Sequence, residues 1–305
     1  MSPSVVGQDI DEVLGVDLLA LVRARGVPLT GVTEITGLPS PVRARGAFLL
    51  EFADGARLKG RRLRSAERAA RVERLQAVIG DGFSRILGRH GAALLLEWVE
   101  GRPLGSLPAV PAEVLHRAGG LLGALHARHA GHAAEGPGPS VQDLLDGLAR
   151  DVDLLRAADL MDAALADDAL VAATASRPDS ATVGIIHKDY CAANLVLGVD
   201  GALVAVDNAT LSVGPHDLDL GRAWARWPMS PGARARFAAG YEAHRPLEPC
   251  LRHFAFWASC ALVGSAATRL RARARGALAS LARLRALLAK GAVAPGDARH
   301  PFRVM

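Results

Sequence analysis

The stretch that decides the fold is HKDYCAANLVLGVDGALVAVDN, residues 187–208. Within it, two short apolar runs, 195–199 and 202–206, flank the pair Asp200-Gly201. An Asp-Gly pair between two β-forming runs is among the strongest hairpin indications that a sequence offers. The stretch therefore predicts two antiparallel strands joined by a two-residue turn.

The predicted turn decides which side chains face each other across this hairpin. If Asp200-Gly201 form the turn, Asn194 comes to face Asp207. Directly opposed side chains have Cβ atoms about 4.5 to 5.5 Å apart, and an amide oxygen and a carboxylate at that separation can share one Mg²⁺ ion. Asp189 lies five residues before Asn194 and brings a further carboxylate near this pair. It is the candidate base for a phosphoryl transfer to a hydroxyl group.

The first hundred residues predict a small sheet with helices. A second Asp-Gly pair, Asp54-Gly55, joins two apolar runs and predicts another hairpin, and Ser65 is placed to cap a helix that reaches about Val78. A helix is also expected near residues 11–25, and strands are expected at 32–36, 47–52, 56–63 and 92–99.

The remainder of the chain predicts helices interrupted once. Periodic Ala-Leu-rich stretches predict helices at 112–129, 141–173, 231–244 and 249–290, and the non-helical segment 184–221 lies between them. We therefore expect an α+β fold with an N-terminal lobe at residues 1–96, a connector at 97–104 and a helical C-terminal lobe at 105–305.

Lysine usage singles out one strand residue. Of the 36 basic residues only three are lysine, and they are Lys59, Lys188 and Lys290. Lys59 lies on the third predicted strand, where a compact ammonium group in an arginine-rich chain indicates a point charge directed at phosphate oxygens. The alternative is a solvated lysine on an edge strand.

Several of these stretches, in the same order, resemble the aminoglycoside phosphotransferases and their kinase relatives. The run from His187 to Asn194 resembles their H-x-D-x-x-x-x-N catalytic loop, and Val206-Asp207-Asn208 resembles the metal-binding segment that follows it. Residues 95–104 are similar to the connector between the lobes, residues 121–126 to a helix behind the site, and residues 214–220 to the segment after the metal aspartate. The resemblance extends from about residue 32 to residue 227.

The resemblance implies a bilobal protein-kinase-like fold, ATP and Mg²⁺ as cofactors, and a small-molecule hydroxyl acceptor such as an antibiotic, a sugar or an amino alcohol. ATP versus GTP is left open. Glu67 or Glu73 would pair with Lys59, with Glu73 favoured because it lies further along the helix. The other implied roles are Asp189 as base, Asn194 and Asp207 as Mg²⁺ ligands, Lys59 on the phosphates, backbone groups of Glu97, Trp98 and Val99 on the adenine, and structural support from His187 and Asp219.

One departure from the family pattern keeps another function in view. The loop expected to cover the phosphates, residues 36–41, has one glycine and two prolines, and proline has no N–H to offer a phosphate. This favours, as the alternative, a non-catalytic pseudokinase that binds nucleotide or a partner protein. A protein kinase is disfavoured, because the short segment between Asp207 and Gly214 leaves little room for an activation loop.

Composition narrows the class of protein further. The net charge is +5, and the excess arginines near the C-terminus wrap around a helix and form no single stripe, so a nucleic-acid partner is not expected. Three scattered cysteines predict neither a disulfide framework nor a zinc site. We expect neither a membrane span nor a secretory signal, and hence a cytoplasmic protein.

The acidic stretch 143–168 is a solvated helix face or a surface for a cationic acceptor.

Overall fold

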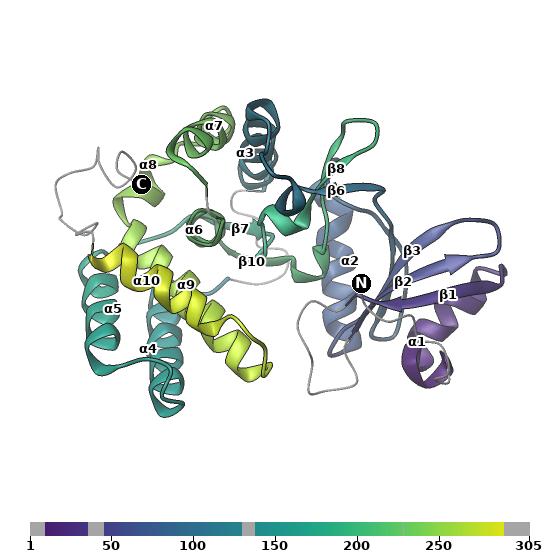
Figure 1. Ribbon diagram of the computed structural model, residues 1–305, viewed down its shortest axis with the longest axis horizontal. Coiled ribbons are helices and arrows are strands. Elements are labelled where there is room, and N and C mark those ends of the chain that lie inside the picture. The colour runs from purple at the N-terminus through teal and green to yellow at the C-terminus, as the bar shows by residue number, and fades with distance from the viewer. Residues whose placement is uncertain (1–9, 36–45, 130–137, 228, 290–305) are drawn as a thin grey trace. The chain divides into compact units, whose positions relative to one another are not determined.

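The computed structural model describes residues 10–35, 46–129, 138–227 and 229–289 (Figure 1). The expected phosphate-covering loop, residues 36–41, lies outside the described residues. The chain divides into two compact units. Unit 1 comprises Met1–Gly101 with Val196–Leu211, and unit 2 comprises Arg102–Leu195 with Ser212–Met305. The hairpin that follows the catalytic loop in sequence therefore belongs to unit 1.

Unit 1 is built on a five-stranded sheet in the order β1-β2-β3-β5-β4, with every neighbouring pair antiparallel. Its strands are β1 (Leu29–Glu34), β2 (Gly46–Phe52), β3 (Arg57–Arg62), β4 (Ile86–His90) and β5 (Ala93–Glu97). Four of these correspond to predicted strands, whereas β4 was not predicted. Its two large apolar residues are adjacent and are followed by Gly88 and Arg89, so apolar and polar residues do not alternate as they usually do along a strand.

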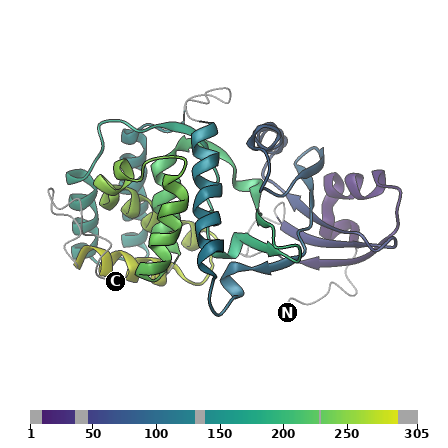
Figure 2. The same cartoon turned by 90° about the horizontal axis from the view of Figure 1, so that it is seen from above.

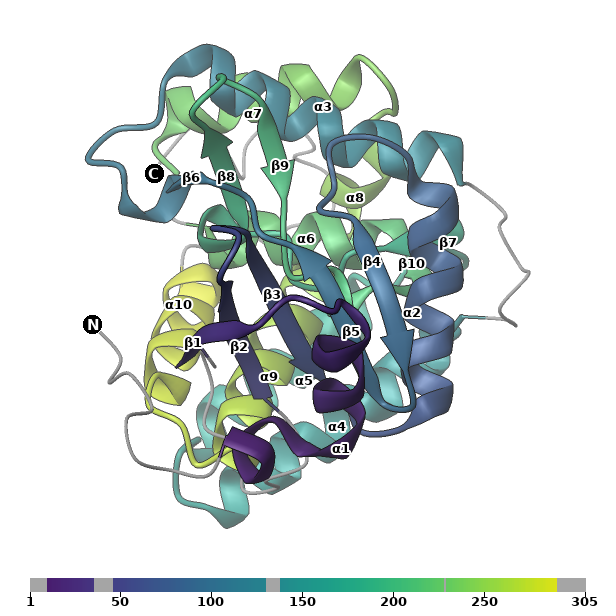
Figure 3. The ribbon, with the colours of Figure 1, turned by 90° about the vertical axis from the view of Figure 1, so that its right-hand side faces the viewer.

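Alternation along the strands gives the sheet two covered faces. Leu95 packs with the helix α1 (Ile10–Ala24), whereas its neighbours Leu94 and Leu96 pack with the helix α2 (Ala66–Ile79). Figure 3 shows the sheet with α1 in front of it. Ser65 caps α2 as predicted, since its side chain accepts a hydrogen bond from the Arg68 N–H at 3.3 Å. The sheet is therefore a rigid layer that fixes the direction of each strand side chain.

Both Asp-Gly hairpins differ from the predicted two-residue turn in the same way. In the second, the Gly198 N–H donates to the carbonyl of Ala202 at 2.8 Å, so the loop has three residues and the predicted register is wrong by one position. The first hairpin repeats this with Phe52 and Ala56 at 3.0 Å. The loop glycines adopt φ of 81° and 79°, and each loop aspartate accepts a hydrogen bond from the backbone N–H two residues on. These carboxylates cap a turn that ends in a glycine bulge.

Unit 2 is mainly helical, and three helical predictions need correction. The predicted helix 141–173 is two helices, because Asp159 has a left-handed φ of 55° and Asp162 caps a new helix. The predicted helix 249–290 is three helices, and α6 lies partly inside the segment expected to be non-helical. The helices are α3 (Ala112–Arg128), α4 (Val141–Ala157), α5 (Ala163–Ala175), α6 (His216–Arg226), α7 (Pro231–Glu242), α8 (Glu248–Arg252), α9 (Phe254–Arg271) and α10 (Ala277–Ala289).

Two short sheets complete the architecture. In unit 2, β7 (Val183–Ile186) pairs with β10 (Ser212–Pro215) and delivers the chain to residue 187. The other sheet has the order β6-β8-β9, with β6 (Gly101–Pro103), β8 (Leu195–Gly198) and β9 (Leu203–Ala205). In unit 2 α3 lies beside α7 (Figure 2), and α9 is buried along most of its length. Among the described helices, none is both long and apolar enough to span a membrane.

This arrangement confirms the expected fold class. An antiparallel sheet with its helices forms the N-terminal part, and the C-terminal part is helical. Residues 97–104, expected as a connector, contain the boundary between the units at Gly101.

Candidate active site

In unit 1, the strand β3 brings Lys59 to Asp207. The Lys59 side chain lies on the sheet face opposite to α1, because the adjacent strand position, Leu58, packs on the α1 side. Its Nζ lies 3.1 Å from Asp207 Oδ1, and Arg61 Nη1 lies 3.8 Å from the same oxygen. Asp207 has a left-handed φ of 64° and begins the 3₁₀ turn η3 (Asn208–Thr210). Two expected site residues, far apart in sequence, are thus neighbours.

Asn208 fixes the backbone beside Asp207. Its buried side-chain amide donates to Gln76 Oε1 at 2.8 Å and to the Ser84 carbonyl at 2.7 Å. These bonds join η3 to the helix α2 and to the loop before β4. The position of the Asp207 backbone is therefore set by these polar contacts of Asn208.

The expected pairing of Lys59 with a glutamate of α2 differs from the structure. Glu73 pairs with Arg89 of β4, with an Oε2–Nε distance of 2.7 Å. Glu67 lies in the first turn of α2, where a hydrogen bond with Ser65 lowers its pKa. Lys59 instead pairs with Asp207. Glu73 is drawn toward β4 because that strand, absent from the sequence prediction, places an arginine opposite it.

The residues expected near the adenine follow the sheet. Glu97 ends β5, and its carboxylate accepts hydrogen bonds from the Arg85 N–H and Nε at 3.2 and 3.3 Å. Trp98 and Val99 follow directly, and both are partly buried. They lie on the segment that leads out of unit 1, as the resemblance implied, and their role toward a nucleotide stays a prediction.

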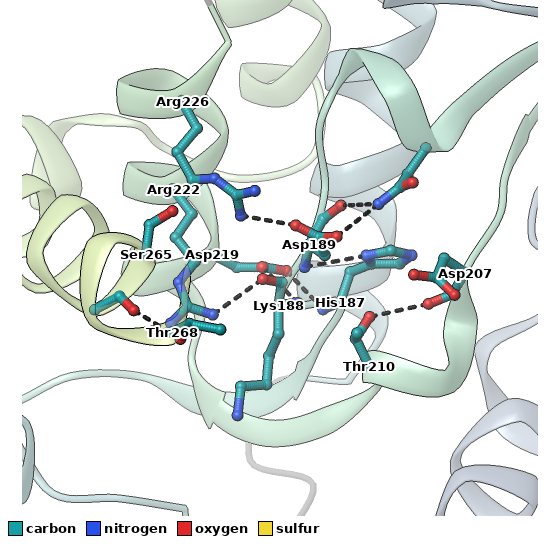
Figure 4. A network of polar contacts seen from close by, with 12 residues as sticks. His187, Lys188, Asp189, Asp207, Thr210, Asp219, Arg222, Arg226, Ser265 and Thr268 are labelled. Carbon is teal, nitrogen blue, oxygen red and sulfur yellow. Dashed lines mark hydrogen bonds and ion pairs between the residues drawn. The ribbon is translucent and has the colours of Figure 1, made fainter. Parts of the chain in front are cut away.

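In unit 2, the catalytic-loop candidates converge on Asp189 (Figure 4). Asn194 Nδ2 donates to Asp189 Oδ2 at 2.8 Å and to its backbone carbonyl at 2.9 Å. Arg226 Nη1, from the end of α6, lies 2.7 Å from Asp189 Oδ1. Each carboxylate oxygen is therefore held from a different side, and the side chain remains 30% exposed, which leaves it open to an acceptor.

The buried carboxylate of Asp219 anchors the same loop. It accepts the His187 N–H at 2.7 Å and the Lys188 N–H at 2.8 Å, and His126 Nε2 lies 3.4 Å away. Burial alone would raise the pKa of Asp219, but the hydrogen bond and charge of His126 and the contacts with His187 hold that pKa below its ordinary value. Asp219 is therefore ionised, and it holds Lys188 at its left-handed φ of 66°.

His187 takes the supporting place that the resemblance implied for it. The Asp189 N–H donates to His187 Nδ1 at 3.3 Å, and the His187 ring packs edge-on against Tyr190. Tyr190 in turn donates to the Ala118 carbonyl of α3 at 2.7 Å. Burial, followed by the charge of Asp189, raises the pKa of the Cys191 thiol, so this cysteine stays protonated near neutral pH, as expected for an inert side chain.

Sequence reasoning missed Arg226 and the role of His126. Arg222 and Arg226 lie four residues apart on α6, so both can face the loop, and Arg222 donates to the Lys188 carbonyl at 3.0 Å. An arginine pair at helical spacing shortly after Asp219 was the available indication. His126 lay within a stretch recognised only as a helix behind the site.

The predicted Mg²⁺ ligands are each suited to the ion in their own surroundings. Asn194 uses its Nδ2 to hold Asp189, which leaves Oδ1, the atom able to bind a hard cation, outside these bonds. Asp207 offers a partly exposed carboxylate. Asn194 belongs to unit 2 and Asp207 to unit 1, so their joint binding of one ion stays a prediction. Within the described residues, no three His, Cys, Asp or Glu side chains group together as a metal site.

Several solved structures are similar to this one. The structure is similar to "Macrolide 2'-phosphotransferase type I" (TM-score 0.63, 18% identity, 92% of this chain and 98% of that chain covered). It is also similar to a choline kinase from Cryptosporidium parvum Iowa II (0.62, 10%, 90% and 97%). A third similar structure is an aminoglycoside phosphotransferase from Alicyclobacillus acidocaldarius (0.55, 16%, 82% and 87%).

These likenesses are likenesses of fold, and they confirm the expected kinase-like architecture. No curated protein matches the chain significantly. Residues 42–254 match the phosphotransferase enzyme family, and this region contains the candidate site residues of each unit, from Lys59 to Arg226. The chain belongs to the phosphotransferase enzyme family.

Proposed function

We propose that this protein transfers the γ-phosphoryl group of ATP to a hydroxyl group of a small molecule. The observation that carries the proposal is the state of Asp189, whose carboxylate is oriented by Asn194 and Arg226 and remains partly exposed. A general base must be fixed in direction yet open to the hydroxyl whose proton it accepts. Among the candidate groups of unit 2, Asp189 meets both requirements.

The reaction assigns a task to each residue group. The acceptor oxygen forms a bond to the γ-phosphorus, the bond from that phosphorus to the β,γ-bridging oxygen breaks, and ADP leaves with that electron pair. The acceptor proton passes to the Asp189 carboxylate. Asp219, through the backbone of His187 and Lys188, keeps the loop in place while this occurs. Such positioning accounts for much of the rate gain in phosphoryl transfer.

The charged groups of unit 1 would hold the nucleotide. Lys59 would exchange its contact with Asp207 for the phosphate oxygens, since an ammonium group suits a phosphate as a point charge. Asp207 and Asn194 would hold Mg²⁺. When bound, this ion would neutralise negative charge on the phosphates. The backbone of Glu97, Trp98 and Val99 would contact the adenine.

An ADP-release assay with Asp189→Asn tests the proposal. We expect Mg²⁺-dependent ADP release with at least one hydroxylated compound from a panel of antibiotics, sugars and amino alcohols. Asp189→Asn keeps the size of the side chain and one acceptor oxygen for Asn194, although its NH₂ group then faces Arg226. It cannot accept the proton, so the rate should fall at least about 100-fold.

The same assay separates an enzyme from a non-catalytic nucleotide-binding protein. Binding of ATP without ADP release for any acceptor would favour the non-catalytic alternative. Equal rates for wild type and Asp189→Asn would remove Asp189 from the role of base. Replacing exposed Asp200, in the hairpin loop of unit 1, with Asn gives a control in which the same chemical change should leave the rate unaltered.

A further inference from the structure

Arginines on α9 and α10 fall into two sets with different partners. Arg271 of α9 pairs with Asp151 at 2.6 Å, and Arg285 of α10 pairs with Asp162 at 2.6 Å. Arg269 and Arg283 each lie two residues earlier on the same helices. Two residues turn a helix by about 200°, so this second pair points away from the acidic helices α4 and α5.

The second pair lies on the side of α9 and α10 that is near α6. Arg283 Nη1 donates to the Arg226 carbonyl at 2.7 Å, and Arg226 holds Asp189. Arg269 is partly buried, and its guanidinium contacts the Ser265 carbonyl at 3.3 Å and the Ser265 hydroxyl. Arg283 therefore contacts the end of α6 that carries Arg226, and Arg269 lies on α9, which packs against α6.

Positive charge is in excess at this place. Burial, followed by the charge of Arg226, lowers the pKa of Arg269; the charge of Asp189 opposes this effect, and that of Arg283 adds to it. The carboxylate of Asp189 is already bound to Arg226. Across the described part of the chain, neither Arg269 nor Arg283 forms an ion pair with a carboxylate. Arg283 is exposed, whereas Arg269 is partly buried. A partly buried guanidinium group without a carboxylate in an ion pair is costly, which points to a negative group supplied to Arg269 from outside the chain.

Some carboxylates of the acidic stretch 143–168 interact within the fold, and its role toward a cationic acceptor stays a prediction. Asp151 and Asp162 neutralise arginines of α9 and α10, and Asp143 is used in the capping box of α4. At these three positions the carboxylates have partners within the fold, whereas Arg269 and Arg283 form no ion pair with a carboxylate among the described residues.

We propose that Arg269 and Arg283 bind an anionic group of the acceptor, so that the preferred acceptor is a hydroxylated carboxylic acid or phosphate ester and not an amine. This inference rests on the proposed function. The fork of N–H groups on each guanidinium matches the two oxygens of a carboxylate or a phosphate. With the anion held by α9 and α10, a hydroxyl elsewhere on the same molecule would be placed against Asp189.

These arginines are assigned to the acceptor and not to the nucleotide because of the unit that contains them. Lys59 and the segment from Glu97 to Val99, which are expected to hold the nucleotide, belong to unit 1. Arg269 and Arg283 belong to unit 2, together with the base that receives the acceptor's proton. Their replacement should therefore alter the KM for the acceptor and leave the KM for ATP unchanged.

The first test measures binding of inorganic phosphate and D-glycerate to the full-length protein by calorimetry. We expect Arg269→Gln and Arg283→Gln each to weaken binding about tenfold or more, as expected for loss of a charge-assisted hydrogen bond. Arg271→Gln and Arg285→Gln are matched controls that remove the same charge from the same helices, and they should leave binding unchanged. Equal weakening by all four variants, or no binding to the wild type, would refute the proposal.

The second test measures ADP release with matched acceptors: polyols of equal chain length bearing a carboxylate, a phosphate, an amine or no charge. Preference for the two anionic series, with the acceptor KM raised in Arg269→Gln and Arg283→Gln, supports the proposal. Preference for amines or neutral polyols, or a rise in the ATP KM alone, overturns it. If the anions bind through these arginines but no acceptor is turned over, the anion site stands and the proposed phosphotransferase function fails.

Discussion

The two units hold their candidate site residues in different ways. In unit 2 the loop is tied to Asp219, whose side chain is 0% exposed and accepts two backbone N–H groups of the loop. In unit 1 Lys59 and Asp207, 14% and 20% exposed, share one contact of 3.1 Å. Buried charged networks lose several kcal/mol when one partner is removed, whereas more exposed pairs contribute little. Unit 2 therefore fixes its geometry in advance, and unit 1 leaves its charged groups able to change partners.

The contrast concerns side chains more than backbone. Asn208 is buried and ties the backbone next to Asp207 to Gln76 and Ser84. The Asp207 carboxylate, one residue away, contacts the partly exposed ends of Lys59 and Arg61. Unit 1 thus places its metal-ligand candidate accurately while its charge partners stay exchangeable, as expected of groups that would bind phosphates in turn.

Asp219→Asn should give the largest effect and tests the pre-organised side of the comparison. An asparagine offers one oxygen and an NH₂ group, so one of the two loop N–H donors would face another donor. We expect unfolding in urea to show a loss of about 3 kcal/mol, together with a fall in kcat of about 100-fold or more as the loop shifts.

Asp217→Asn is the matched control on the first turn of the same helix. Burial raises the pKa of Asp217, which means that its ionised form is disfavoured in the folded protein, so the neutral amide should cost little or even stabilise at neutral pH. If both variants lost the same stability, Asp219 would be an ordinary buried carboxylate and not the anchor of the loop.

Lys59→Met should act on nucleotide binding with little effect on stability. The exchangeable pair with Asp207 is expected to contribute less than about 1 kcal/mol to folding, whereas a charged hydrogen bond to phosphate is worth about 1.5 to 3 kcal/mol. The KM for ATP should therefore rise about 10-fold to 100-fold. Parallel urea unfolding and ADP-release measurements would check both expectations.

Arg61→Gln provides the comparison for Lys59→Met, because Arg61 lies 3.8 Å from the same Asp207 oxygen. Its replacement should change the KM for ATP less than that of Lys59 does. A loss of about 2 kcal/mol or more in Lys59→Met with an unchanged KM would mean that unit 1 uses Lys59 as a structural residue, and the distinction between the units would disappear.

The sequence predicted the layers of the fold where periodicity was regular. The strands carrying Lys59 and Leu95 and the capped helix α2 were placed correctly, since alternation and the Ser65 cap are local properties. The turns were not, because an Asp-Gly pair suits both a two-residue turn and the three-residue loop with a bulge, and the choice depends on whether the aspartate carboxylate caps the turn.

Long-range partners were the least predictable part of the candidate site. The link from Asp189 to Asn194 was inferred from short spacing, but Arg226 lies 37 residues after Asp189 and reaches it only because α6 packs behind the loop. Glu73 was assigned to Lys59 on distance along the chain, and β4 diverted it to Arg89. No local pattern shows which charged residue another strand or helix will bring near.

His216→Leu should have the smallest effect at neutral pH and a visible one in acid. His216 stacks on His126 with ring centroids 4.4 Å apart, and burial, followed by the charge of His126, lowers its pKa to about 2. The pKa of this histidine in the unfolded chain is about 6.5. Between pH 6.5 and pH 2, the unfolded state therefore binds one proton more at this side chain than the folded state does. Stability is therefore fully present above pH 6.5 and is lost as pH falls, by at most about 1.4 kcal/mol per pH unit.

His216→Leu removes this titration, so its unfolding free energy should fall less steeply below pH 6.5 than that of the wild type. Replacing exposed His90 of β4 with Gln should leave the wild-type slope in place. Hydrogen exchange then locates the effect, because His216, His126 and Asp219 all belong to unit 2. Acid should lower protection in the loop held by Asp219 before it does so in the β3–β5 ladder, and equal loss in both places would show that the pre-organised network extends beyond unit 2.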